Sequence, residues 1–267
     1  IHMKKHYALG VIGGGFMARA ILSGALAKNV LSADSILVCD PSEDSRSYFR
    51  AQGIDVSEDN REAVQNADYV LFAVKPQTFP KVAEGLKGER FPVIISIMAG
   101  KTKESIRRAT GAEKVARIMP NLPCSVGAGM TAIDASELED AERSFVLGLF
   151  LSVGEVIETD EGQLNAVTAV SGSGPAYIYL FLRSLIHAAE EQGLRPEQAV
   201  TPAYQTMEGG LTMAKTSGKS LDDLIAAVSS KGGTTIAALD SFHGDDFEGS
   251  VSRAVAAAAR RAGELSE

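Results

Sequence analysis

The chain has 267 residues, a formal net charge of −8, 45% hydrophobic residues and 22% charged residues. These values fit a globular protein of one large domain or two ordinary ones. The negative charge and the lack of a long basic block argue against a nucleic-acid partner, and no apolar run approaches the ~20 residues of a membrane span. Two separate cysteines and no signal-like segment favour a cytoplasmic location, and four scattered histidines suggest no metal site.

Short apolar runs alternate with helical patterns in the N-terminal half. This alternation predicts an α/β Rossmann domain, with a doubly wound and mostly parallel sheet. Strands are predicted at 7–13, 35–39, 67–74, 91–98 and 114–119, and helices at 16–28, 42–53 and 101–110.

After about residue 160 the strand signals end and apolar residues recur at helical spacing. We therefore predict a dinucleotide-binding domain at 3–162 and an all-α domain at 163–267. Gly209 and Gly210 lie inside one helical pattern, where they indicate either a close helix–helix approach or a break in the helix.

Gly13, Gly15 and Ala18 form a G-x-G-x-x-A pattern between the first predicted strand and the first predicted helix. In this place Gly13 permits a tight turn, Gly15 lets the backbone approach a pyrophosphate, and Ala18 lets the helix lie close to the strand. The alternative is a flexible loop without a ligand, but the strand–loop–helix context favours a bound dinucleotide.

Asp40 ends the second predicted strand. An acidic residue there usually accepts hydrogen bonds from the adenosine ribose, which favours NAD. Ser42, Ser45 and Arg46 follow closely and are candidates for binding a 2′-phosphate instead, which favours NADP. Asp40 is also a candidate cap of the next turn, so the sequence leaves this choice open.

Other strand ends carry further candidates, because ligands of such sheets lie beyond the carboxyl ends of the strands. Lys75 leaves a buried strand and Pro76 holds it extended, so Lys75 would bind phosphate, shape a nicotinamide site or stay a solvated loop lysine. The small residues at 96–100 would pass beneath a nicotinamide. Two prolines bracket Asn121, whose amide would reach the carboxamide or the substrate unless the segment is only a structural turn.

Two polar segments belong to the helical part. The run SGSGPA at 171–176 predicts a helix start with Ser173 as its N-cap, and its small residues suit a flat ligand or another backbone. The run SSKGGTT at 229–235 precedes a helical pattern, where free backbone N–H groups favour an anion. Its spacing is not that of a Walker A loop.

Together these segments resemble the pyrroline-5-carboxylate reductase family over essentially the whole chain from Met3. The landmarks are IGGGFMA (12–18), AVKPQ (73–77), RIMPNLP (117–123), SGSGPAY (171–177) and SSKGGTT (229–235). The resemblance implies reduction of the C=N bond of 1-pyrroline-5-carboxylate to L-proline, the final step of proline biosynthesis, with NADPH as cofactor and NADH as the alternative. It also implies that the helical domain binds substrate and interlocks with a partner subunit, in a homodimer or a ring of dimers.

The resemblance carries over to individual site residues. The hydroxyl of Thr235 is expected to help protonate the imine nitrogen. With Asp40 and Ser42 from the strand end, the expected cofactor residues are Gly13, Gly15, Phe16, Met17, Ala18, Asp40, Ser42, Asn60, Lys75, Pro76, Ala99 and Asn121. The expected substrate loop consists of Ser230, Gly232, Gly233, Thr234 and Thr235.

One residue departs from the family pattern, which has proline where this chain has Lys231. Lysine loses the stiffening of a fixed φ and adds a positive charge, so it would tighten carboxylate binding, loosen the loop or mark a specialised paralogue. Lys231 alone favours a regulatory dinucleotide-binding protein without turnover. The competing enzyme classes are a reductase of another cyclic imine and a β-hydroxyacid-type dehydrogenase, whose helix-borne lysine would be Lys215 or Lys219.

Overall fold

The computed structural model describes residues 5–266. The chain divides into two compact units, the first formed by Ile1–Ser173 with Ala258–Glu267 and the second by Gly174–Ala257. Within the described residues every strand belongs to the first unit, and the second unit is helical. The domain limits predicted from the sequence, 3–162 and 163–267, stay a prediction.

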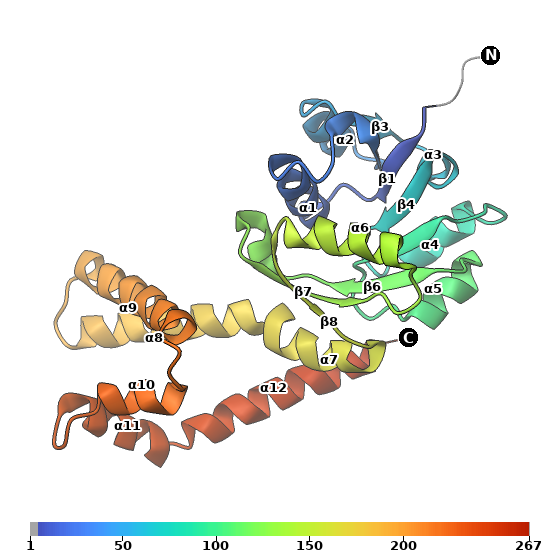
Figure 1. Cartoon of the computed structure of the whole chain (residues 1–267). Helices are drawn as coiled ribbons and strands as arrows, with labels where there is room; N and C mark the ends of the chain where they lie inside the picture. Colours follow the sequence, from blue (N-terminus) through green and yellow to red (C-terminus); the bar gives the residue numbers. More distant parts are fainter. Residues whose placement is uncertain (1–4, 267) are drawn as a thin grey trace. The chain divides into compact units, whose positions relative to one another are not determined.

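A single sheet forms the centre of the first unit (Figure 1). Its strands are β1 (Tyr7–Ile12), β2 (Ile36–Cys39), β3 (Asp55–Ser57), β4 (Ala67–Phe72), β5 (Val93–Ser96), β6 (Val115–Met119), β7 (Gly129–Asp134) and β8 (Gly154–Glu158). Their order is β3-β2-β1-β4-β5-β6-β7-β8, and β6 and β7 form the one antiparallel pair of this sheet. The order turns back on itself at β1 and β4, which confirms the predicted doubly wound, mostly parallel sheet.

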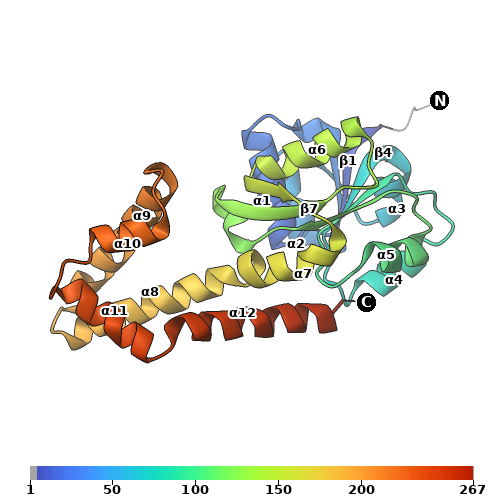
Figure 2. The ribbon, with the colours of Figure 1, turned by 60° about the horizontal axis from the view of Figure 1, so that its bottom comes forward.

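Helices cover both faces of this sheet (Figures 1 and 2). Residues of β1 alternate between the faces: Leu9 and Val11 join one buried cluster, and Ile12 joins the other. The first cluster includes residues of α1 (Phe16–Ala27), α2 (Glu43–Arg50) and α6 (Asp140–Leu151). The second includes residues of α3 (Asn60–Asn66), α4 (Phe79–Gly85) and α5 (Lys103–Thr110). Short 3₁₀ turns are η1 (Ala33–Ser35), η2 (Leu122–Val126) and η3 (Glu161–Gln163).

Helix α7 (Leu164–Val167) continues into a π-helical segment, η4 (Thr168–Gly172), and α8 (Gly174–Glu191) begins after a bend at Ser173. Ser173 has helical dihedral angles, and its N–H donates to the carbonyl of Thr168 at 2.9 Å. Helix α8 begins directly after Ser173, as predicted, but Ser173 lacks the extended backbone of a typical N-cap because a π-turn precedes it.

The second unit consists of α8, α9 (Pro196–Thr216), α10 (Leu221–Ala227), α11 (Thr234–Gly244) and the part of α12 (Phe247–Glu264) that precedes Ala258. Helix α9 continues through Gly209 and Gly210, so the predicted alternative of a helix break there is wrong. Within residues 5–266, no helix combines the length and apolarity needed to cross a bilayer.

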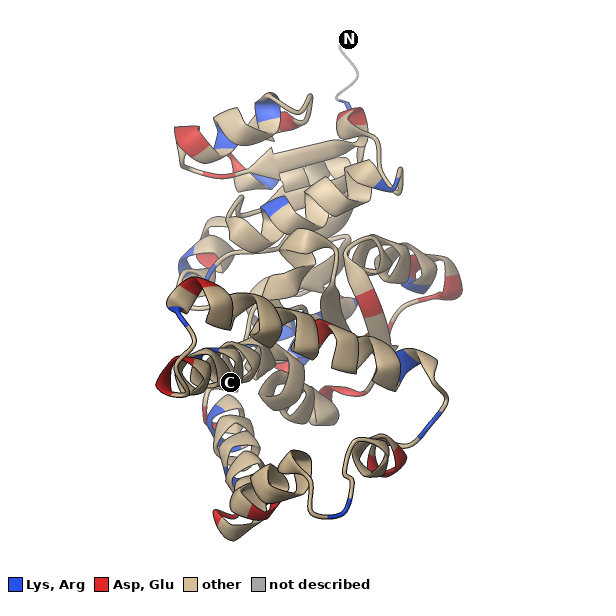
Figure 3. Cartoon of the chain, turned by 90° about the vertical axis from the view of Figure 1, so that its left-hand side faces the viewer, with Lys and Arg blue, Asp and Glu red and all other residues tan. Residues whose placement is uncertain are grey.

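Many large apolar side chains of the second unit are exposed. In α8 and α9 only Ala199 and Ala203 are buried, and Figure 3 shows long stretches of ribbon without charged residues. A monomeric protein rarely exposes so many large apolar side chains next to one another, so this surface is typical of an interface. Exposed members include Ile178, Tyr179, Leu180, Phe181, Tyr204 and Leu211.

Candidate functional site

The glycine loop after β1 has the shape that a dinucleotide needs. Gly13 has φ +99°, and a Cβ there would lie 2.9 Å from the carbonyl carbon of Ala73, so only glycine fits. At Gly15 a Cβ would meet nothing within 4 Å, which leaves the backbone open to a ligand. Ala18 is 1% exposed and packs against the sheet, as the pattern predicts.

Helix α1 begins directly after this loop and its N-terminus has no side-chain cap. Gly15 is the N-cap, with extended backbone, and Phe16 and Met17 open the first turn. The backbone N–H groups of a first helical turn lack partners within the helix, and together with the helix dipole they favour a negatively charged group. The pyrophosphate of NAD(P) therefore fits this place.

A pocket of about 530 Å³ opens beside the loop, within the first unit. It brings together five of the predicted cofactor residues, namely Gly13, Gly15, Asp40, Asn60 and Lys75. Lining residues that the sequence did not single out include Glu58, Asp59, Thr78, Lys81 and Val82. Cys39 also lines the pocket, and burial raises the pKa of its thiol to about 12, so it stays protonated and is no nucleophile.

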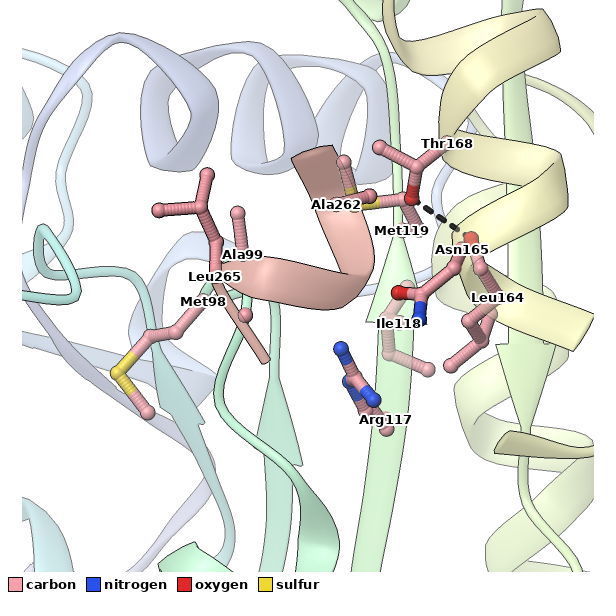
Figure 4. Close-up of a pocket in the computed structure, with 11 residues that line it drawn as sticks. Met98, Ala99, Arg117, Ile118, Met119, Leu164, Asn165, Thr168, Ala262 and Leu265 are labelled. Carbon is pink, nitrogen blue, oxygen red and sulfur yellow. Dashed lines mark hydrogen bonds between the residues drawn. The ribbon is translucent and has the colours of Figure 1, made fainter. Parts of the chain in front are cut away.

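A second pocket, of about 70 Å³, contains Ala99 (Figure 4). Its walls come from the loop after β5, from β6, from α7 and η4, and from the end of α12 with the turn after it, all within the first unit. Arg117 of β6 lines this pocket while its Nη1 donates to Glu161 Oε1 at 3.0 Å. Arg117 is not among the site residues predicted from the sequence, although a charged residue inside an otherwise apolar strand is a visible signal.

Asn121 is 9% exposed and its amide is held at both ends. Its Nδ2 donates to the carbonyl of Ser171 at 3.0 Å, and its Oδ1 accepts from the N–H of Met130 at 2.8 Å. These bonds join the loop after β6 to β7 and to η4. Asn121 thus has a structural role, and its contact with the carboxamide or the substrate stays a prediction.

The predicted substrate residues gather in the second unit, at the start of α11. The N–H of Gly233 donates to the carbonyl of Ser230 at 2.9 Å, and Gly232 has φ +72°, so residues 230–233 form a type II turn. Gly233 then caps α11 without a side-chain bond, and Thr234 and Thr235 are its first residues. Like the start of α1, this helix start has no side-chain cap, so its backbone N–H groups suit an anion.

Two family models match the chain. The model described as "NADP oxidoreductase coenzyme F420-dependent" matches residues 8–100, and that described as "Pyrroline-5-carboxylate reductase dimerisation" matches residues 161–265. Together with the glycine loop and the pocket beside it, these matches define a dinucleotide-dependent oxidoreductase with a helical dimerisation domain.

Individual relatives make the assignment specific. The pyrroline-5-carboxylate reductase of Synechocystis is 37% identical over 96% of this chain and 97% of its own, and that of Pseudomonas aeruginosa is 38% identical over 96% of each. The solved structure of the reductase from Coxiella burnetii has a TM-score of 0.88 at 34% identity and covers 98% of this chain and all of its own. A Plasmodium falciparum relative, solved with NADP bound, has a TM-score of 0.85 at 28% identity and covers 98% of this chain and 99% of its own. The chain belongs to the pyrroline-5-carboxylate reductase family.

Family membership confirms the predicted oxidoreductase activity on a cyclic imine and the predicted NAD(P)H dependence. The β-hydroxyacid dehydrogenase alternative loses its support, because Lys215 and Lys219 are exposed and the relatives belong to another class. The roles of individual site residues stay predictions.

Proposed function

We propose that this chain reduces the C=N bond of 1-pyrroline-5-carboxylate to L-proline, with the cofactor bound by the first unit and the substrate carboxylate bound by the loop before α11. The observation that carries this proposal is that two helices begin without a side-chain cap directly after paired glycines, α1 behind the glycine loop and α11 behind Gly232 and Gly233. The reaction requires two anion sites, one for a pyrophosphate and one for a carboxylate, and each helix start offers one.

When bound, NAD(P)H supplies the hydride that the imine carbon accepts. The backbone N–H groups of Thr234 and Thr235 hold the substrate carboxylate, and this fixes the orientation of a small ring. The ring nitrogen needs a proton to become the amine of proline, unless it binds as an iminium. A threonine hydroxyl is a weak acid, so Thr235 orients the nitrogen or relays a proton from water.

The test is oxidation of NADH and NADPH, followed at 340 nm, with 1-pyrroline-5-carboxylate and the purified chain. We expect Thr235→Ala to lower kcat by about tenfold or more. Thr235→Ser, which keeps the hydroxyl, should retain most of the activity. Thr201→Ala, at an exposed position of α9, is the matched control and should behave like the wild type.

Oxidation of neither cofactor would contradict the proposed reaction. Unchanged kcat and KM in Thr235→Ala would remove only Thr235 from the mechanism. A substrate without the carboxylate, 1-pyrroline, tests the anion site separately, because loop variants should change its KM far less than that of the full substrate.

We further propose that the helical unit pairs two copies into a homodimer. The exposed apolar residues of α8 and α9 and the match of residues 161–265 to a dimerisation model support this. Light scattering on a sizing column should give twice the mass of the chain, or a larger even multiple if dimers assemble into a ring. A monomer at micromolar concentration would contradict the proposal.

A cytoplasmic location is proposed as well. It is supported by the two cysteines, Cys39 and Cys124, which are both free and buried, as is usual in a reducing compartment. Fractionation of cells that produce the chain tests this, and recovery with the membrane or exported fraction would contradict it.

A further inference from the structure

The carboxylate of Asp40 is held in a fixed orientation at the end of β2. Its Oδ2 accepts from the N–H of Gly14 at 2.7 Å, and its Oδ1 accepts from the N–H of Ser42 at 2.8 Å. A carboxylate has about four lone-pair positions, so about two remain to accept further bonds. Asp40 lines the same pocket as Gly13 and Gly15, so these positions are available to the hydroxyl groups of a ribose bound there.

The residues that would otherwise bind a 2′-phosphate are already engaged. Ser45 is buried, and its hydroxyl donates to the carbonyl of Gly14 at 2.9 Å. The Ser42 oxygen accepts from the N–H of Ser45 at 3.4 Å and so caps α2. The Ser42 hydroxyl keeps its own proton, but it is neutral and offsets no phosphate charge.

Arg46 is the one cation among Ser42, Ser45 and Arg46, and it does not line the pocket. Its side chain is 9% exposed. Its Nη1 donates to the carbonyl of Asp40 at 2.7 Å, and its Nη2 donates to Glu43 and to Glu58, each at 2.7 Å. The positive charge of Arg46 is thus neutralised by two carboxylates before any ligand binds.

The ion pair between Arg46 and Glu43 persists at neutral pH. Hydrogen bonds from Arg50, Ser47 and Arg46 lower the pKa of Glu43 to about 2, so Glu43 stays ionised. The pocket lining near β2 and α3 adds Glu58 and Asp59 to Asp40, whereas its two lysines, Lys75 and Lys81, come from the β4–α4 segment. The region beside Asp40 is therefore acidic.

We propose that Asp40 determines cofactor specificity and that this chain binds NADH in preference to NADPH. The 2′-phosphate of NADPH brings about −1.5 to −2 charges next to a fixed carboxylate, and Arg46, the arginine that follows it in α2, is already paired with two carboxylates. NADH offers a 2′-hydroxyl instead, which donates to Asp40. The inference rests on the proposed function, since it requires the pocket beside the glycine loop to hold the dinucleotide.

The test is isothermal titration of the full chain with NAD⁺ and with NADP⁺, in parallel with kcat/KM for NADH and NADPH. We expect NAD⁺ to bind at least about tenfold more tightly, equivalent to about 1.4 kcal/mol. Asp40→Asn removes the charge and keeps the shape, and it should lower the NAD⁺ to NADP⁺ affinity ratio by about tenfold. Asp44→Asn is the matched control, because it removes the same charge from an exposed position of α2, and its ratio should equal that of the wild type.

Two further variants leave Asp40 itself untouched. Glu58→Gln removes one of the two negative charges that neutralise Arg46, so it should improve NADP⁺ binding several-fold and leave NAD⁺ binding nearly constant. Lys81→Met removes the lysine of α4 that lines the pocket, and it should leave the ratio unchanged. A loss of NADP⁺ binding confined to Lys81→Met would locate the phosphate at Lys81 and overturn the inference.

The remaining outcomes are decisive as well. Equal or tighter binding of NADP⁺ by the wild type overturns the preference, even if imine reduction proceeds normally. Equal effects of Asp40→Asn and Asp44→Asn would show that only overall charge matters, which also overturns it. Failure of both dinucleotides to bind would instead contradict the proposed function on which the inference rests.

Discussion

A Cβ atom on Gly100 would overlap the carbonyl oxygen of Leu265, so the loop after β5 and the turn at the end of α12 are in close contact. Gly100 also has φ +76°, a backbone conformation that residues other than glycine rarely adopt. Ser266 adds a hydrogen bond from its hydroxyl to Asn165 Oδ1 at 3.2 Å. The C-terminal turn therefore supports the loop that carries Ala99.

Gly100→Ala should displace this turn. We expect the free energy of unfolding to fall by about 1–2 kcal/mol from the left-handed conformation alone, and further from the clash with Leu265. The KM for the dinucleotide should rise, because the loop with Ala99 loses its support. Urea denaturation and steady-state kinetics measure the two effects.

Gly88→Ala is the matched control for this variant. Gly88 has φ +87°, but a Cβ there would meet nothing within 4 Å, so only the conformational cost applies. If the two variants lose equal stability and keep the same KM, the contact with Leu265 has no energetic role.

Lys103, the first residue of α5, and Asp134, the last residue of β7, form a buried ion pair. The Lys103 Nζ lies 3.0 Å from Asp134 Oδ2, with side chains 10% and 3% exposed. Lys103→Met should lower the free energy of unfolding by about 3 kcal/mol, because it leaves a buried carboxylate without its cation. Adding Asp134→Asn should restore part of the loss, and Lys87→Met, at an exposed pair, should change little. Equal stability of Lys103→Met and the wild type in urea denaturation would contradict this.

Asp134 also makes the stability of the protein depend on pH. Burial raises the pKa of its carboxyl group, but hydrogen bonds from Ser136 and Lys103 outweigh burial and leave the pKa below its ordinary value of 3.8. A carboxyl group whose pKa is lower in the folded state than in the unfolded state stabilises the protein at pH values above its unfolded-state pKa. This contribution is lost as the pH falls through its folded-state pKa. Stability should therefore decline below about pH 4, and less steeply in Asp134→Asn. Identical slopes in urea titrations from pH 3 to 6 would show that Asp134 does not contribute.

The fold was predictable where buried strands are long and apolar. Residues 67–74 form such a run, and β4 appears there. The strand β3 has three residues, and β7 contains the buried polar residues Thr131 and Asp134, so neither shows the apolar pattern by which strands are recognised. At Ser173 the local capping signal predicts the start of α8 but does not reveal the π-turn directly before it.

The site was predictable where one short motif supplies it. The glycine loop and the turn before α11 each lie within a few residues, and their backbone geometry follows from glycine positions. Other contacts join residues from different elements of the chain. They are the contact between Gly100 and Leu265 and the ion pair between Arg46 and Glu58. Such contacts depend on strand order and helix packing, which a single sequence does not encode locally.

Lys231 occupies the second position of the type II turn formed by residues 230–233, as the φ of Gly232 and the bond between Ser230 and Gly233 indicate. Proline is favoured at that position because its fixed φ matches the turn. Lys231→Pro should therefore fold normally, and it should raise the free energy of unfolding by about 0.4–1 kcal/mol through the entropy of the unfolded chain.

The same variant separates the stiffness of the loop from its charge. If the Lys231 ammonium attracts the substrate carboxylate, Lys231→Pro and Lys231→Met should both raise the KM for 1-pyrroline-5-carboxylate by about threefold to tenfold. Both should leave the KM for 1-pyrroline unchanged, because that substrate lacks the carboxylate, and the increases should shrink at high salt. If only the methionine variant is impaired, the charge matters and the stiffness of proline compensates for its loss. If neither variant changes KM, Lys231 takes no part in substrate binding, and the turn alone supplies the carboxylate site.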